Sequence, residues 1–252
     1  MNCIFCNNEN EATSVEHIIP ESFGNKKYLM TRSSVCDSCN AKFSKFERKA
    51  LSNSVFVFER ARLGIKSKKG KNVKGKVEDL EVEGNKEFKK QLITVKGLDS
   101  KSVENYDKEN GTLQMIVSSF DKSEEAGAKL ILKMGIEALY TSDFNLYNNL
   151  DINEARDYLL AKNTKDWPVI ISDYEPSKFK SIPKMGVKYE LGIKQIKLEY
   201  LQLNENVLLI RFTFGGVTMM VNILNRDTNW ITEFKTNDSL TQIYPKHYRD
   251  KI

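Results

Sequence analysis

Cys3-Ile4-Phe5-Cys6 and Cys36-Asp37-Ser38-Cys39-Asn40 frame the segment Ser14-Val15-Glu16-His17-Ile18-Ile19-Pro20. The two CxxC pairs contain all four cysteines of the chain, and 29 residues separate them. Four soft sulfur ligands at such a spacing favour Zn²⁺. A redox CxxC motif is the alternative, but it explains one pair and leaves the other without a role. We therefore expect Cys3, Cys6, Cys36 and Cys39 to bind a structural Zn²⁺.

The composition is typical of a globular protein. The chain has 252 residues, which is enough for one large domain or two small ones. Of these residues, 40% are hydrophobic and 29% are charged. No apolar run approaches the ~18 residues that span a bilayer, and the first residues lack the pattern of a secretion signal. Paired CxxC motifs act as metal ligands in a reducing compartment, so we expect a cytoplasmic protein without a membrane partner.

The first 51 residues predict a small unit of strand, loop, strand and helix. Val15 to Ile19 reads as a short strand, which Pro20 closes, and Gly24 is suited to the following turn. Tyr28 to Val35 can form the return strand. Asp37 or Ser38 can then cap a helix that carries Asn40 in its first turn and buries apolar residues at helical spacing, namely Phe43, Phe46 and Ala50.

A basic connector is expected over residues 52–79. Residues 66–76 place six lysines in eleven positions, together with two glycines. Such a run is commonly a solvated loop or turn. The alternative is an arm that follows a phosphate backbone, and this alternative gains weight only beside a nuclease site. The net charge of +5 is by itself weak evidence for a polyanionic partner.

Residues 80–252 predict an α+β domain with mostly antiparallel strands. The clearest helix runs from Asp121 to Tyr140, with Asp121 or Ser123 as its cap, and a second runs from Ile152 to Ala161. Alternating apolar residues predict strands at 91–95, 113–117, 169–172, 187–195, 197–203, 207–214 and 217–224. Asn204-Glu205-Asn206 and Gly215-Gly216 suit hairpin turns. Scattered tyrosines and tryptophans could stack on bases but are more typical of a core, and His247 is expected at the surface.

His17 admits two interpretations. A lone histidine is commonly satisfied inside a small core. Here it follows a carboxylate, is flanked by isoleucines and lies on a segment that a metal site would fix. Because an unperturbed imidazole titrates near ~6.5, His17 can accept a proton from water at neutral pH. Glu16 and Asn40 offer the hard oxygen ligands that Mg²⁺ or Mn²⁺ prefers.

The run from Glu16 to Asn25, followed by Cys36-Asp37-Ser38-Cys39-Asn40, resembles the HNH endonuclease family, also called His-Me finger or ββα-metal. It is similar to the subgroup with an added four-cysteine zinc site. The resemblance covers about residues 3–51 and implies a zinc-bound ββα-metal unit at the N-terminus. Weaker similarity continues through residues 60–65 and the lysine run.

The resemblance implies a role for each matching residue. His17 would be the general base, and Asn40 would be the final ligand of a catalytic Mg²⁺ or Mn²⁺. Glu16 stands where many members carry an aspartate ligand, and Asn25 is the candidate for the middle asparagine that supports His17. The usual position of that asparagine holds Thr31 and Arg32. The zinc would then be structural, and the reaction would be one-metal hydrolysis of a phosphodiester bond.

The nucleic-acid contacts are less defined. Arg32 and Arg48 could contact the scissile phosphate or could be ordinary surface charges. Lys66, Lys68, Lys69 and Lys71 would follow the backbone if the lysine run is an arm. DNA is the expected partner, RNA is an alternative, and a homodimer or a protein partner stays open.

Three functions fit these features. The first is a metal-dependent DNA endonuclease, which resembles enzymes of restriction and antiphage defence. The second is a non-catalytic zinc module that binds nucleic acid, which would keep the cysteines and lysines but would have no need of His17. The third is a latent nuclease whose C-terminal domain senses a ligand or partner, and it predicts little cleavage until an activator is present.

Overall fold

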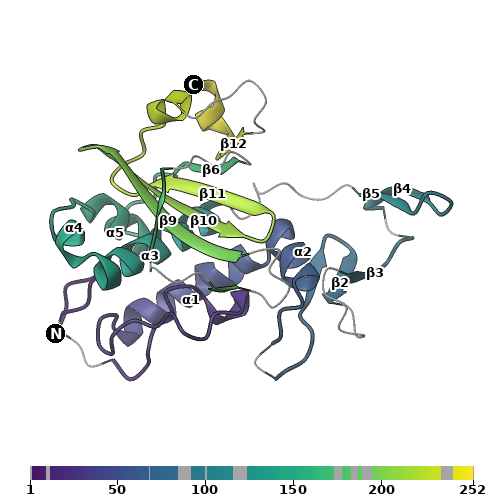
Figure 1. Cartoon of the computed structure of the whole chain (residues 1–252), viewed down its shortest axis with the longest axis horizontal. Helices are drawn as coiled ribbons and strands as arrows, with labels where there is room; N and C mark the ends of the chain where they lie inside the picture. The colour runs from purple at the N-terminus through teal and green to yellow at the C-terminus, as the bar shows by residue number, and fades with distance from the viewer. Residues whose placement is uncertain are drawn as a thin grey trace.

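The computed structural model describes residues 2–9, 12–67, 69–84, 92–99, 101–115, 124–172, 178–182, 187–188, 195–233 and 241–251. The fold is mixed α+β, with an N-terminal region of little regular structure followed by helices and antiparallel sheets (Figure 1). The N-terminal region contains the short 3-10 helix η1 (Glu21–Phe23), the helix α1 (Asp37–Leu51) and the helix α2 (Ser54–Arg62).

The largest sheet has seven strands in the described part of the chain, all paired antiparallel. Their order is β12-β6-β11-β10-β9-β7, and β8 also pairs with β9. The strands are β6 (Val169–Ser172), β7 (Lys180–Ser181), β8 (Val187–Lys188), β9 (Gln195–Asn204), β10 (Val207–Phe214), β11 (Val217–Asn222) and β12 (Thr241–Tyr244). Every residue of β10 is buried, as expected for the central strand of a covered sheet.

The helix α3 (Glu124–Ser142) lies between this sheet and the N-terminal region, because it contacts α1 as well as β6, β10 and β11. Its residues from Leu130 to Leu139 are buried all round, which is typical of a helix enclosed in a core. A Cβ added at Gly135 would lie 2.7 Å from Ile210 Cγ1, so the helix packs closely on β10 at this point. Two shorter helices follow, α4 (Phe144–Asn148) and α5 (Asn153–Leu159).

Two smaller sheets extend from the body of the molecule. One contains β1 (Lys74–Val77), β2 (Leu80–Gly84) and β3 (Ile93–Lys96), and it packs on α2. The other is the hairpin of β4 (Val103–Asp107) and β5 (Thr112–Met115), which projects from the right-hand side in Figure 1. The 3-10 helices η3 (Asn229–Glu233) and η4 (Lys246–Lys251) flank β12.

The N-terminal region shares its core with the large sheet. Phe23 of η1 packs edge-on against Phe56 of α2 and against Phe212 and Phe214 of β10, with ring centroids 4.6–5.3 Å apart. All four rings are fully buried. Aromatic pairs at such distances add to the hydrophobic gain of burial. The predicted division into residues 1–51, 52–79 and 80–252 stays a prediction, and these contacts cross each of its boundaries.

Most of the predicted regular elements are confirmed. The strands expected at 169–172, 197–203, 207–214 and 217–224 correspond to β6, β9, β10 and β11, and both hairpin turns lie where they were expected. The second predicted helix is α5, and the first is α3, although its expected caps Asp121 and Ser123 lie outside the described residues. The predicted strands at 91–95, 113–117 and 187–195 also fall partly outside them. Of their described residues, 93–95 lie in β3, 113–115 in β5, 187–188 in β8 and Gln195 at the start of β9.

The predicted N-terminal hairpin is wrong in its extent. Its antiparallel pairing is a single bridge between His17 and Leu29, with hydrogen bonds from Ile18 N to Tyr28 O and from Met30 N to Glu16 O. The return strand stops because the chain turns at residues 31–34, where Ser33 has φ 70°. The cap of α1 also differs, since Cys36 rather than Asp37 or Ser38 occupies the N-cap position.

Candidate functional site

The four cysteine sulfurs meet at the N-terminus of α1. All four Sγ atoms lie within 4.8 Å of one another, and those of Cys6 and Cys36 are 3.7 Å apart. Zinc bonded to four thiolates at about 2.3 Å has sulfur–sulfur distances of about 3.8 Å. Backbone N–H groups of Cys36 and Cys39 point at Cys3 Sγ and Cys36 Sγ, each at 3.4 Å. None of the four forms a disulfide, so the cluster is positioned to bind a metal ion.

The proton balance of the four cysteines also suits a cation. A hydrogen bond from Cys39 is the main reason why the pKa of Cys3 falls to about 4. The same hydrogen bond, together with burial, raises the pKa of Cys39 well above its usual value, and burial raises the pKa of Cys6. The thiolate form of Cys3 is therefore stabilised by the thiol proton of Cys39. A divalent metal ion takes the place of those protons when four thiolates bind it.

A small polar network connects the cluster to the segment that carries His17. Asp37, the first residue of α1, accepts hydrogen bonds from the backbone and hydroxyl groups of Thr13 and Ser14, at 2.7–3.4 Å. The hydrogen bond from the Thr13 hydroxyl is the first cause that lowers the pKa of Asp37. Asn40 Nδ2 donates to Ser14 Oγ at 3.0 Å. The first turn of α1 therefore fixes residues 13–14, just before Glu16 and His17.

The orientation of the Asn40 amide leaves a possible ligand atom. Its nitrogen is bonded to Ser14, and its oxygen makes no hydrogen bond to any residue that the structure describes. An amide oxygen is a hard ligand of the kind that Mg²⁺ accepts. Asn40 therefore fits the predicted role of a metal ligand, which stays a prediction.

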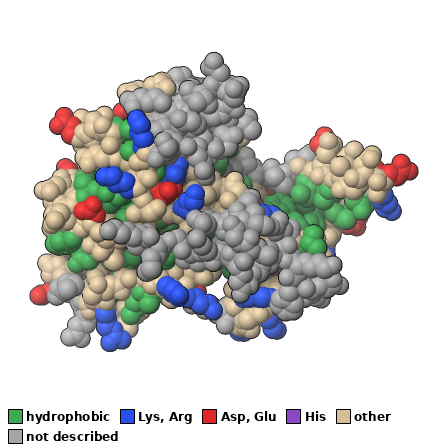
Figure 2. All heavy atoms as spheres, in the orientation of Figure 1, with side chains coloured by type: hydrophobic (Ala, Val, Ile, Leu, Met, Phe, Trp, Pro, Cys, Tyr) green, Lys and Arg blue, Asp and Glu red, His purple; other side chains and the backbone are tan. Residues whose placement is uncertain are grey.

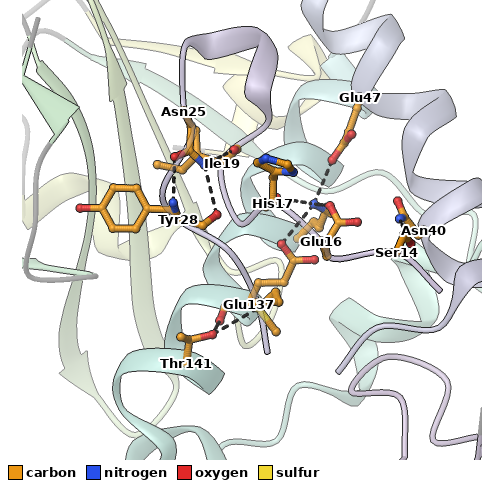
Figure 3. A network of polar contacts seen from close by, with 12 residues as sticks. Ser14, Glu16, His17, Ile19, Asn25, Tyr28, Asn40, Glu47, Glu137 and Thr141 are labelled. Carbon is orange, nitrogen blue, oxygen red and sulfur yellow. Dashed lines mark hydrogen bonds and ion pairs between the residues drawn. The ribbon is translucent and has the colours of Figure 1, made fainter. Parts of the chain in front are cut away.

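His17 is half-buried on the bridge between residues 17 and 29. Its imidazole makes no hydrogen bond or ion pair within the described ranges, whereas its backbone carbonyl accepts a hydrogen bond from Lys133 at 3.3 Å. Figure 3 shows the ring among the labelled residues of this region, with no dashed line to it. A histidine satisfied in a core has a partner for its ring nitrogens, and this one has none among the residues described.

Asn25 holds the loop that follows His17. It is fully buried, and its Nδ2 donates to Ile19 O at 2.6 Å and to Tyr28 O at 3.1 Å (Figure 3). Its Oδ1 accepts from the backbone N–H groups of Lys27 and Tyr28 at 3.0 and 2.9 Å. The side chain therefore closes the loop through backbone contacts and does not bond the His17 ring. Asn25 is connected to His17 through Tyr28 and the bridge between His17 and Leu29, and its support of His17 stays a prediction.

Glu16 points into a buried ionic cluster around Lys133. Its Oε1 lies 2.6 Å from Lys133 Nζ, and its residue is 8% exposed. The same ammonium lies 2.9 Å from Glu47 Oε1 and 3.1 Å from Glu137 Oε2. Figure 3 shows the carboxylates of Glu16, Glu47 and Glu137 converging from different elements. The structure thus brings Glu16 to α3, while Asn40 is bonded to Ser14 and Asn25 to the loop.

Burial of this cluster sets the charges of its members. Burial raises the pKa of Glu137 well above its usual value, and attraction to Lys133 only partly offsets this. Burial alone would lower the pKa of Lys133, but attraction to Glu137, Glu47 and Glu16 outweighs it and raises the pKa. Lys133 therefore keeps its positive charge, whereas burial shifts Glu137 towards its protonated form.

The predicted nucleic-acid contacts lie at the surface. Arg32 and Arg48 are exposed, and Arg48 Nε donates to the Ser44 carbonyl. Lys66, Lys69 and Lys71 are exposed, and Lys68 lies outside the described residues. Figure 2 shows Lys and Arg side chains along the lower edge of the face in view.

A pocket of about 540 Å³ lies beside the lysine run. Among the described residues of its wall, the basic side chains are Arg60, Lys66, Lys71 and Lys74, and the acidic one is Glu83. Arg60 Nε donates to the carbonyl of Ser22 in η1 at 3.0 Å, which connects the pocket to the loop after His17. Burial lowers the pKa of Arg60, so its charge is only partly hydrated.

Sequence reasoning missed Lys133, Glu137, Glu47 and Arg60 as residues of this region. A signal existed for the first two, because Lys133 and Glu137 are charged residues four apart within a stretch of α3 that is otherwise apolar. Charged residues at such positions are rarely fully buried unless they are paired. Nothing in the sequence indicated that Lys133 would pair with Glu16, which lies 117 residues earlier in the chain.

A comparison with protein families found that residues 3–56 match the HNH endonuclease family. Comparisons with curated proteins and with solved structures found no match. Residues 3–56 are an HNH endonuclease domain with a four-cysteine cluster positioned to bind metal. The match indicates a nuclease, and therefore a nucleic-acid substrate and a phosphodiester hydrolase reaction. No described helix is long and apolar enough to cross a membrane.

Proposed function

We propose that this protein is a metal-dependent HNH endonuclease that hydrolyses phosphodiester bonds of DNA. The observation that carries the proposal is the half-buried imidazole of His17, which has no hydrogen bond to any described residue, on a segment held from both sides. Asn40 and the cysteine cluster fix the chain before it, and Asn25 fixes the chain after it. Such preorganisation is what a general base requires.

His17 takes the proton of the water that attacks phosphorus, and the leaving oxygen departs in line with the attack. The oxygens of Asn40 and Glu16 would hold Mg²⁺ or Mn²⁺, which supplies positive charge for the developing oxyanion. Glu16 Oε1 is shared with Lys133, so Asn40 offers the less encumbered ligand atom. The zinc bound by the four cysteines is structural in this proposal.

The pocket beside the lysine run supplies the nucleic-acid contact. Arg60 and Lys71 line it, and neither forms an ion pair with another described residue. Lys74, by contrast, lies 3.0 Å from Glu83. Phosphate groups of a backbone are the ligands that such cations bind without regard to sequence. Arg32 and Arg48 are further candidates on the exposed surface of the HNH domain.

Cleavage of supercoiled plasmid with Mg²⁺ or Mn²⁺ tests the proposal. We expect His17→Ala to lower the rate by about 10²-fold or more, because general base catalysis contributes about that factor. His247→Ala is the matched control, since the chain has two histidines and His247 is exposed. EDTA should abolish cleavage by the wild-type protein. A variant lacking His17 that cleaves at the wild-type rate would refute the assignment.

Two other outcomes would redirect the proposal. Wild-type protein that binds DNA but does not cleave it would favour a binding module, or a nuclease that needs an activator. Cleavage of RNA alone would replace the substrate. A role in restriction or antiphage defence stays a prediction, which protection of cells from phage by the wild-type gene and not by the His17→Ala gene would test.

A further inference from the structure

Lys133 is a fully buried charged group in contact with the HNH domain. Its side chain is 0% exposed and comes from α3. Lys133 lies 116 residues after His17 in the sequence. The rest of the buried part of this helix is apolar except for Glu137. An ammonium in such a place is costly, and a well-packed apolar side chain would often serve the core as well or better. The charge is therefore expected to do something that packing does not.

The contacts of Lys133 show what that is. An ammonium has three N–H donors. One hydrogen bond goes to Glu16 Oε1 at 2.6 Å and another to the backbone carbonyl of His17 at 3.3 Å. Glu47 of α1 and Glu137 of α3 lie within 3.1 Å of the same nitrogen. One cation thus touches two consecutive residues, the second of which is the proposed general base.

The segment from Glu16 to Ile18 is held on its other side by the bridge. Met30 N donates to Glu16 O at 2.8 Å, and Ile18 N donates to Tyr28 O at 3.1 Å. The backbone carbonyl of His17 is the polar group that points towards α3. Because the imidazole has no hydrogen bond of its own among the described residues, its direction depends on how the backbone at His17 is held.

We propose that Lys133 is a positioning residue for His17, supplied to the HNH domain by the helix α3 of the following region. It fixes the His17 carbonyl and the Glu16 carboxylate together, so the ring presents its free nitrogen at a constant angle. The match to the HNH family ends at residue 56, so the catalytic unit is incomplete without α3. This proposal rests on the proposed function only in calling His17 the general base.

The test compares Lys133→Met with Lys129→Met, which makes the same change one turn earlier on α3. Lys129 pairs with Glu125 and lies 4.7 Å above the Tyr158 ring, and among the described residues it has no hydrogen bond or ion pair to the HNH domain. Both variants are assayed on plasmid DNA for kcat and KM, and their zinc content and melting temperature are measured. We expect kcat of Lys133→Met to fall by about 10²-fold, as for a misaligned catalytic group, with KM changed less than about threefold.

A spectroscopic readout separates positioning from a general loss of structure. With histidine labelled at Cε1, an NMR spectrum contains two signals, because the chain has His17 and His247 only. His247→Gln assigns them. In Lys133→Met the His17 signal should move while the His247 signal does not, and in Lys129→Met neither should move. This readout needs no cleavage, so it tests the positioning even if the wild-type protein proves inactive.

Lys133→Met leaves Glu16, Glu47 and Glu137 without their cation and could therefore fail to fold. A second variant, Lys133→Met with Glu137→Met, removes the ion pair within α3 and keeps the volume filled. A folded variant with wild-type kcat and an unmoved His17 signal would overturn the proposal. So would failure of both variants to fold, since Lys133 would then be a requirement of the core rather than of His17.

Discussion

The HNH domain and the seven-stranded sheet achieve order in different ways. In the sheet, β10 pairs with β9 over eight residues and with β11 over six, and it is buried along its whole length. Among the described residues, the β-pairing of the HNH domain near His17 is one bridge, and side chains hold the backbone that a ladder would otherwise hold. The cysteine cluster, Asp37 and Asn25 each hold backbone there. The backbone order of a region without regular strand pairing depends on a few side chains and on the cysteine cluster. The lack of a full ladder also leaves His17 partly exposed.

The largest effect is expected from loss of the metal cluster. Cys36→Ser should remove the metal and unfold the N-terminal region, since structural zinc contributes on the order of 10 kcal/mol to folding. Metal content by mass spectrometry and limited proteolysis measure this. The protease should then cut the chain in the segment before α1. The β-sheet signal in circular dichroism should persist, because the large sheet stays folded. A Cys36→Ser protein that keeps one zinc ion and resists the protease as well as the wild type would show that the N-terminal region does not depend on the cluster.

Asn25→Ala should have the next largest effect. It leaves Ile19 O and the N–H groups of Lys27 and Tyr28 without partners, and Tyr28 O keeps only its hydrogen bond from Ile18 N. At about 0.5–1.5 kcal/mol for each of the four hydrogen bonds lost, we expect a loss of about 2–6 kcal/mol in the free energy of unfolding. Urea unfolding measures it. The control is Asn163→Ala, whose side chain accepts one hydrogen bond from Lys165 N and should change stability far less.

A matching perturbation in the regular region sharpens the comparison. Gly135→Ala places a Cβ 2.7 Å from Ile210 Cγ1, and overpacking of this kind costs about 1–3 kcal/mol. Nuclease activity should be retained at low temperature, because the loss is global stability. Adding Ile210→Ala removes the clashing atoms, so the double variant should lose less than the sum of the single variants. Simple additivity would show that the two positions do not touch as described.

The smallest effect is expected from the basic pocket. For Arg60→Gln or Lys71→Gln, each in a His17→Ala background, the slope of log affinity for DNA against log salt should fall by about 1. Fluorescence anisotropy at several salt concentrations measures it. Lys108→Gln, an exposed change in the turn of the β4–β5 hairpin, is the control. Equal slopes for all three variants would place the nucleic-acid contact elsewhere on the surface.

The sequence was a poor guide where the secondary-structure preference of a segment and its packing in the fold favour different structures. Residues 54–62 form α2, although Val55, Phe56, Val57 and Phe58 alone gave no sign of a helix, because β-branched and aromatic residues are weak helix formers. Asn53 caps this helix by accepting from Val55 N, and burial of Phe56 stabilises it. The N-terminal return strand failed for the opposite reason, since its sequence permits a strand and the turn at Ser33 prevents one.

The sequence by itself determined the HNH domain, the cysteine cluster and most of the large sheet. Ligand spacing and alternation are local properties that neighbouring residues carry, so they can be read along the chain. Only the tertiary structure decided where Glu16 points, that Asn25 acts through the backbone, and that Lys133 reaches His17. These contacts join residues up to 117 positions apart, and the packing of α3 against α1 and the sheet brings them together. Such packing depends on the whole core, which no short segment specifies.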